Sequence, residues 1–199
     1  MSLPLAVVLA LALSAFACAK SPGDRVQENV RTFQSEQRPE RLIASARAFA
    51  RVGDLTRAEQ YYAAAIETGG DEAKIIPELL KVCVQDGRYR VAITYAENYT
   101  RRHPNDVSAR FVLGTLYAAV GEVPEARAEL ERVIVLRPSE PQVHFALAIL
   151  MRDGQKDRVE AEKHFREYLR LAPQGAHAEE ARASLLQTVP PESGSSGAQ

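Results

Sequence analysis

The chain has 199 residues, which is enough for one ordinary domain or a short array of repeats and too few for two large catalytic lobes. Lysine and arginine number 25 against 26 aspartates and glutamates, so the net charge is −1 and no global basic field exists to hold nucleic acid. Hydrophobic residues make up 46% and charged residues 26%, values that exclude a wholly disordered chain and a polytopic membrane protein.

An apolar, uncharged run begins at Leu3 and ends in the small-x-small motif of residues 15–17. The run is shorter than the roughly 20 apolar residues of a membrane-spanning helix, and it has the form of a secretory signal peptide. We therefore predict a signal peptide at residues 1–17 and export of the protein.

Cys18 follows this motif directly, and residues 14–18 resemble a bacterial lipobox, in which the cysteine is acylated and becomes the first residue of the mature protein. The resemblance implies an outer-membrane lipoprotein that faces the periplasm, because Ala19 is not the aspartate that favours retention in the inner membrane. The alternative is cleavage after Ala17 by the general signal peptidase, which would leave a soluble periplasmic protein. Residues 18–38 are polar and are predicted to be a tether.

A repeat of 34 residues follows the tether. Glycine recurs at this interval, and so does alanine, at Gly53, Gly87 and Gly121 and at Ala58, Ala92 and Ala126. The interval defines four units, 39–72, 73–106, 107–140 and 141–175, of which the last has one extra residue around Gly154 to Arg158. Each unit has the pattern of two amphipathic helices joined at the glycine.

The third unit shows the pattern most fully. Its unit positions 7, 8, 11, 15, 20, 24, 27 and 32 are occupied by Leu113, Gly114, Tyr117, Gly121, Ala126, Leu130, Val133 and Pro138. This pattern closely resembles the tetratricopeptide repeat (TPR). The resemblance implies an all-α fold, a right-handed α-solenoid of four TPR helical hairpins.

Three further features concern packing. Position 8 must be small because the two helices of a unit cross there, and Leu80 is the poor fit. Pro77 lies in the first helix of unit two, and we expect it in the first turn of a helix that starts near Ala73. Residues 176–189 carry an apolar stripe and are predicted to form a capping helix, followed by a disordered tail at 190–199.

The sequence contains no glycine-rich phosphate loop, no HExxH motif and no nucleophile elbow. His144 and His164 fall on different helices of unit four without a third ligand, and Cys83 has the position of a buried apolar residue. We therefore expect no enzymatic activity, no cofactor and no metal site.

In this family the concave surface is lined by positions 2, 5, 9, 12 and 13 of each first helix. By that register, the resemblance implies a partner-binding groove that is mostly basic in units one and two and mostly apolar in units three and four. The candidate groove residues are Arg47, Arg51, Lys74, Lys81, Phe111, Thr115, Phe145 and Ile149. We expect Phe111 and Phe145 to be apolar anchors, and Arg47, Arg51 and Lys81 to grip acidic groups.

One subfamily is set aside. Tetratricopeptide co-chaperones that hold a C-terminal carboxylate use lysine, asparagine and arginine at positions that here carry Ile43, Arg47, Pro77 or Glu78, Ser108 and Val112. The carboxylate clamp of those co-chaperones is therefore absent.

These features predict a non-catalytic adaptor of the bacterial cell envelope that binds a protein partner, a peptide or helix with apolar and acidic groups. Nucleic acid and a small-molecule substrate are not expected partners. Small lipoproteins of this architecture resemble those that help to assemble outer-membrane, pilus or secretin complexes. The alternative is a structural or regulatory scaffold in polysaccharide or cytochrome maturation that binds through its convex face.

Overall fold

The computed structural model describes Gln27 and residues 38–186. The predicted signal peptide, Cys18, most of the predicted tether and the predicted tail lie outside the described residues.

Every regular element between residues 38 and 186 is helical. In chain order the elements are α2 (Pro39–Arg51), α3 (Leu55–Glu67), α4 (Glu72–Gln85), α5 (Tyr89–Arg102), α6 (Val107–Ala119), α7 (Val123–Leu136), α8 (Pro141–Ile149), the π-helix η1 (Leu150–Gln155), α9 (Arg158–Leu171) and α10 (Ala178–Leu186). None of these helices has both the length and the hydropathy needed to cross a bilayer.

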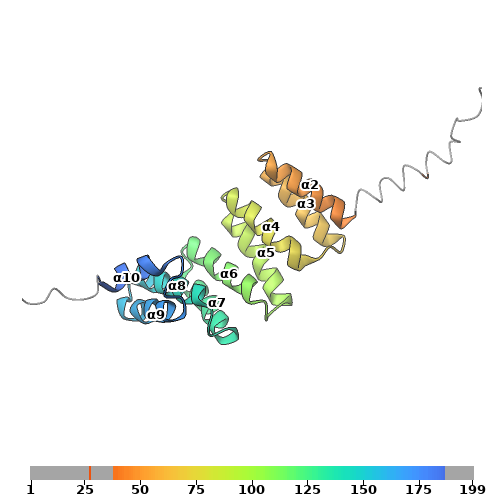
Figure 1. Ribbon diagram of the computed structural model, residues 1–199. Coiled ribbons are helices and arrows are strands. Elements are labelled where there is room, and N and C mark those ends of the chain that lie inside the picture. The colour runs from red at the N-terminus through yellow and green to blue at the C-terminus, as the bar shows by residue number, and fades with distance from the viewer. Residues whose placement is uncertain (1–26, 28–37, 187–199) are drawn as a thin grey trace, which may run out of the picture.

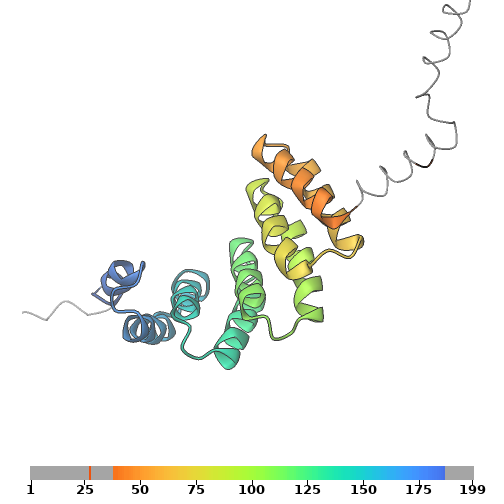
Figure 2. The same cartoon turned by 45° about the vertical axis from the view of Figure 1, so that its right-hand side comes forward.

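The helices form hairpins that stack side by side (Figures 1 and 2). The pairs α2–α3, α4–α5, α6–α7 and α8–α9 each pack together, and the second helix of one pair packs against the first helix of the next. The last helix, α10, packs against α9. The predicted all-α solenoid of helical hairpins is therefore confirmed.

Aspartate side chains set the start of four helices. The carboxylates of Asp54, Asp71, Asp106 and Asp157 accept a hydrogen bond from a backbone N–H two or three residues later, at the start of α3, α4, α6 and α9. Such a cap satisfies a backbone donor that has no partner within the helix and contributes about 1 kcal/mol.

The repeating glycines occupy the turns within the hairpins. Gly53, Gly87 and Gly121 have φ values of 80°, 70° and 80°, in the left-handed region that other residues enter only with strain. The 34-residue interval of glycines therefore reflects one turn conformation used three times.

Unit four makes this turn differently. The N–H after the left-handed residue donates to a carbonyl five residues earlier in units one to three, from Asp54 to Phe49, from Arg88 to Cys83 and from Glu122 to Tyr117. In unit four Asp157 donates to Met151, six residues earlier, and Lys156 is the left-handed residue at φ 59°. The extra residue of this unit is therefore absorbed by the π-helix η1.

Small residues lie where the paired helices cross. Ala46 and Ala148 are buried, and a Cβ added to Gly114 would lie 2.9 Å from Cγ of Leu130. Leu80 occupies the equivalent place in α4, and the α4–α5 pair is less closely packed than the other three hairpins. A leucine at the crossing point accounts for this wider spacing because it needs more room than a methyl group.

The prediction for Pro77 is wrong. The helix α4 starts at Glu72, so Pro77 lies in its second turn. Proline has no N–H, and the carbonyl of Ala73 consequently has no donor four residues later. The break in the hydrogen-bond ladder lies on the side of α4 that faces α6, because Ala73 and Pro77 both line the hollow between these two helices.

Candidate functional site

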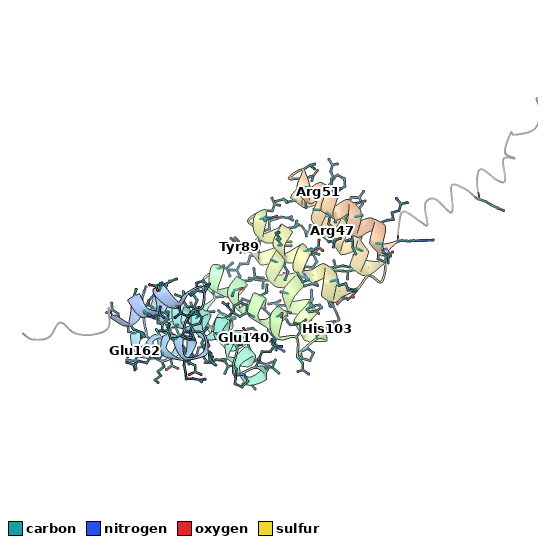
Figure 3. The ribbon with its side chains drawn as sticks, viewed as in Figure 1. Arg47, Arg51, Tyr89, His103, Glu140 and Glu162 are labelled. Atoms are coloured by element: carbon teal, nitrogen blue, oxygen red, sulfur yellow. The ribbon has the colours of Figure 1, made fainter. Side chains whose placement is uncertain are left out.

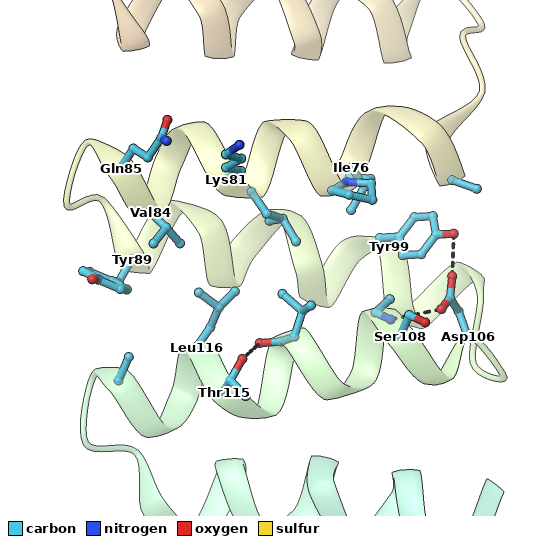
Figure 4. A pocket seen from close by; sticks show the side chains of 16 residues that line it. Ile76, Lys81, Val84, Gln85, Tyr89, Tyr99, Asp106, Ser108, Thr115 and Leu116 are labelled. Carbon is cyan, nitrogen blue, oxygen red and sulfur yellow. Dashed lines mark hydrogen bonds between the residues drawn. The ribbon is translucent and has the colours of Figure 1, made fainter. Parts of the chain in front are cut away.

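An open hollow of about 750 Å³ lies between the first helices of units two and three, α4 and α6 (Figure 4). Its walls are mainly aliphatic and include Ile76, Leu80, Val84, Val112 and Leu116. We call this hollow the apolar groove. Ile76, Leu80 and Leu116 are nearly fully buried and line the deepest part of the groove, whereas Val112 is 36% exposed and lies at its edge, which we call the lip.

Two tyrosines of α5, Tyr89 and Tyr99, also line the apolar groove. The Tyr99 hydroxyl donates to Oδ2 of Asp106 over 2.9 Å, and Oδ1 of Asp106 accepts from the Ala109 N–H over 3.0 Å. Burial, followed by the hydrogen bond to Asp106, raises the pKa of Tyr99 to about 12, which keeps the phenol a neutral donor. One end of the groove is thereby held by a hydrogen-bonded pair from α5 and the start of α6.

A second hollow of about 650 Å³ lies between α2 and α4. Four of its lining side chains are charged, namely Arg47, Arg51, Glu78 and Lys81. We call it the basic hollow, because three of these four charges are positive. Figure 3 shows Arg47 and Arg51 on the same helix, α2.

Glu78 is fully engaged within the basic hollow. Arg47 donates to both of its carboxylate oxygens, over 2.9 Å in the bond from Nε to Oε2, and the Tyr62 hydroxyl donates to Oε2 over 2.6 Å. The Arg47 bond is the main reason why the pKa of Glu78 is held below its usual value. Arg47 and Glu78 neutralise each other, so the positive charge left in the hollow belongs to Arg51 and Lys81.

The two hollows share one wall. Lys81 and Gln85 of α4 line both of them. Neither Arg51 nor Lys81 has an ion-pair partner within 4 Å among residues 38–186, in contrast to Arg47. The first helices of units one to three thus present an aliphatic surface beside two cations that have no ion-pair partner among the described residues.

The structure brings some of the predicted site residues together. Arg47, Arg51 and Lys81 line the basic hollow, and Thr115 lines the apolar groove, where its hydroxyl donates to the Val112 carbonyl over 2.8 Å. Lys74 lines neither hollow, and its ammonium pairs with Asp71 at 2.9 Å.

The other three predicted residues, Phe111, Phe145 and Ile149, also line neither hollow. They pack against the core cluster of the C-terminal half. The Phe145 ring stacks on His177, with ring centroids 4.1 Å apart, so the segment before α10 covers the side chain that we predicted to be an anchor.

Most of the aliphatic wall residues of the apolar groove were not predicted as site residues. Val84 stands at a concave position of the repeat, whereas Ile76, Leu80 and Leu116 stand at positions that normally pack within the array. The available signal was Leu80, since a large residue at the crossing position indicates that the α4–α5 hairpin is locally spread.

A histidine pair lies between α8 and α9. Nδ1 of His144 is 3.2 Å from Nδ1 of His164, and Nε2 of His144 is 3.3 Å from the Pro138 carbonyl. A carbonyl only accepts, so His144 carries its proton on Nε2 and accepts at Nδ1 from His164. Burial, then His144, lowers the pKa of His164. Residues 38–186 contain no cluster of three or more potential metal ligands, so this pair has no third ligand there.

Comparison with known proteins identifies the repeats. The tetratricopeptide repeat family model matches residues 84–141 and 113–176. No curated protein sequence matches the chain.

Solved structures share the fold. YrrB, described as a TPR protein with an unusual peptide-binding site, aligns with a TM-score of 0.63 and 17% identity over 74% of this chain and 76% of its own. A tetratricopeptide repeat protein from Parabacteroides merdae aligns with a TM-score of 0.65 and 19% identity, over 74% of this chain and 58% of its own. MamA from Desulfovibrio magneticus aligns with a TM-score of 0.61 and 20% identity, over 71% of this chain and 80% of its own. Residues 84–176 therefore match the tetratricopeptide repeat family, and the stacked helical hairpins share the fold of these solved structures.

Proposed function

We propose that the protein is a non-catalytic adaptor whose apolar groove binds an apolar segment of a partner protein. The observation that carries this proposal is an open hollow of about 750 Å³ with aliphatic walls between the first helices of units two and three. Hollows of this size with apolar walls are typical binding sites, and a groove between helices suits an amphipathic segment.

The dimensions of the groove limit the partner segment. The groove runs along α6, whose 13 residues span about 20 Å at 1.5 Å per residue. A helix of about four turns or an extended segment of about six residues fills this length. Leu80, Val84 and Val112 supply apolar contact along it. YrrB, one of the structural neighbours, is described as having a peptide-binding site, which supports a peptide as the partner.

The proposed location is the bacterial cell envelope. It rests on the apolar run and cleavage motif of residues 1–17, with Cys18 as the site of lipid anchoring to the outer membrane. An adaptor at this place suits the assembly of an outer-membrane, pilus or secretin complex. Mass spectrometry of the mature N-terminus tests the location, since a diacylglyceryl group on Cys18 is expected and an intact Met1 would contradict export.

Site-specific photo-crosslinking in cells tests the groove. A photoreactive phenylalanine analogue replaces Val112 at the lip of the groove, and the control replaces Val135, which is 80% exposed on α7 and outside both hollows. We expect the analogue at position 112 to give a reproducible adduct with one partner, which the analogue at position 135 does not give.

The result that would contradict a groove adaptor is the reverse pattern. An adduct from position 135 without one from position 112 would favour the alternative, a structural or regulatory scaffold that binds outside the groove. Val112→Glu provides a second test, because a carboxylate at the lip should release the partner without altering the fold.

A further inference from the structure

We infer that Arg51 and Lys81 form a receptor for carboxylates, so that the segment bound in the apolar groove carries acidic residues on the flank that faces α2. This inference rests on the proposed function and specifies the chemistry of its partner. It depends on which charged side chains of the basic hollow already form ion pairs and which do not.

The first step is the pairing within the hollow. Glu78 accepts from Arg47 and from Tyr62, so its carboxylate is satisfied and Arg47 is occupied. Arg47 therefore positions Glu78 and links α2 to α4, and it is not available to grip a partner. Without this pair, Glu78, which lines the hollow together with Lys81, would compete with a ligand for the Lys81 ammonium.

The second step is the charge that remains. Arg51 and Lys81 extend into the same hollow from two helices, and neither has an ion-pair partner among the described residues. Both side chains are exposed, so their positive charges attract an acidic partner as it approaches. The hollow between them has room for a side chain, with a volume of about 650 Å³.

The third step is the position of these cations relative to the apolar groove. Lys81 lines both hollows, so a partner that lies in the groove has its near flank beside Lys81 and its longer side chains within reach of the basic hollow. The other charged residue of the groove, Asp106, lies at the opposite end from Gln85 (Figure 4) and is already hydrogen-bonded to Tyr99 and Ala109. The positive charge thus lies on the α2 side, where acidic residues of the partner are favoured.

The test uses the full chain and two synthetic peptides. Each is an amphipathic peptide of about 14 residues, the length of the groove as a helix, with leucines along one face. One peptide carries glutamates on the flank of that face, and the other carries glutamines at the same positions. Binding is measured by fluorescence anisotropy at about 50 mM and about 500 mM salt.

We expect the glutamate peptide to bind about tenfold more tightly than the glutamine peptide at low salt and about equally at high salt. The double variant Arg51→Gln with Lys81→Gln should lose this preference. The matched control is Arg41→Gln with Arg101→Gln, which removes the same charge from two exposed arginines outside both hollows and should keep the preference.

Two outcomes would overturn the carboxylate receptor while leaving groove binding intact. One is equal affinity for both peptides at low salt, and the other is a preference that survives the Arg51 and Lys81 substitutions. Binding of neither peptide would overturn the proposed apolar groove and the receptor together. A second copy of this chain as occupant would appear in analytical ultracentrifugation as a dimer that the double variant abolishes, and would also overturn a separate acidic partner.

Discussion

At the crossing of α6 and α7, tight packing and helix propensity have opposite effects on stability when Gly114 is replaced by alanine. Replacing Gly114 by alanine raises the intrinsic helix propensity of α6 by about 1 kcal/mol. The new Cβ, however, would lie 2.9 Å from Cγ and 3.0 Å from Cδ2 of Leu130, and 3.3 Å from the Ala126 carbonyl oxygen. Leu130 is 1% exposed and has no solvent space into which to turn.

Overpacking of this kind costs about 1–3 kcal/mol, which exceeds the gain in propensity. We therefore expect Gly114→Ala to destabilise the protein by about 1 kcal/mol and to lower Tm by about 2–4 °C. Urea unfolding followed by circular dichroism measures the change in free energy. Stabilisation of Gly114→Ala by the full propensity gain would refute the close approach of these two helices.

Two further variants separate the causes. Ala118→Gly, at an exposed position of the same helix, measures the propensity cost alone and should destabilise by about 1 kcal/mol. Leu130→Val removes one methylene at the contact, so its effect and that of Gly114→Ala should be less than additive by about 1 kcal/mol.

Three other changes test particular features of the helices. Pro77→Ala restores the missing N–H in the second turn of α4 and should stabilise the protein by about 1–3 kcal/mol in urea unfolding, whereas a loss of stability would show that the proline is needed there. Lys156→Gly relieves the strain of a non-glycine residue in the left-handed conformation at φ 59°, and it should raise the free energy of unfolding by up to about 1 kcal/mol. An unchanged Tm would indicate that the π-helix imposes no strain at this residue. His164 has a lowered pKa in the folded protein, so its neutral form is fully stabilising above the ordinary pKa of 6.5, and stability should fall as the pH drops below that value. His164→Gln should flatten this part of the Tm profile, and an unchanged profile would contradict the partly buried pair with His144.

Much of the fold follows from residues that have only one physical use. Any other residue at φ near 80° would strain the backbone, so the recurrence of glycine at Gly53, Gly87 and Gly121 locates the turns directly. The extra residue of unit four was visible from the interval as well. Its absorption by a π-helix was not, because hydrogen bonds between residues five apart leave no distinct composition in Leu150–Gln155.

The candidate site was less predictable because it depends on pairing between units. The register of the repeat assigns Arg47 and Arg51 to one surface, and both line the basic hollow, but which arginine is occupied depends on Glu78, contributed by the next unit. Phe145 was assigned to the groove by its register, and its stacking on His177 arises from the segment before α10, which follows the last repeat. A periodic pattern describes the interior of an array, and its ends break that pattern.

The most direct test is methyl NMR of the chain on addition of the glutamate peptide described above. Binding in the apolar groove predicts shifts for the methyl groups of Ile76, Leu80, Val84, Val112 and Leu116, which line it from α4 and α6. The methyl groups of Val52, Val135 and Val159 are exposed outside the groove and should not move. Shifts confined to these outer valines, with the groove methyl groups unchanged, would contradict the groove as the binding surface of this protein.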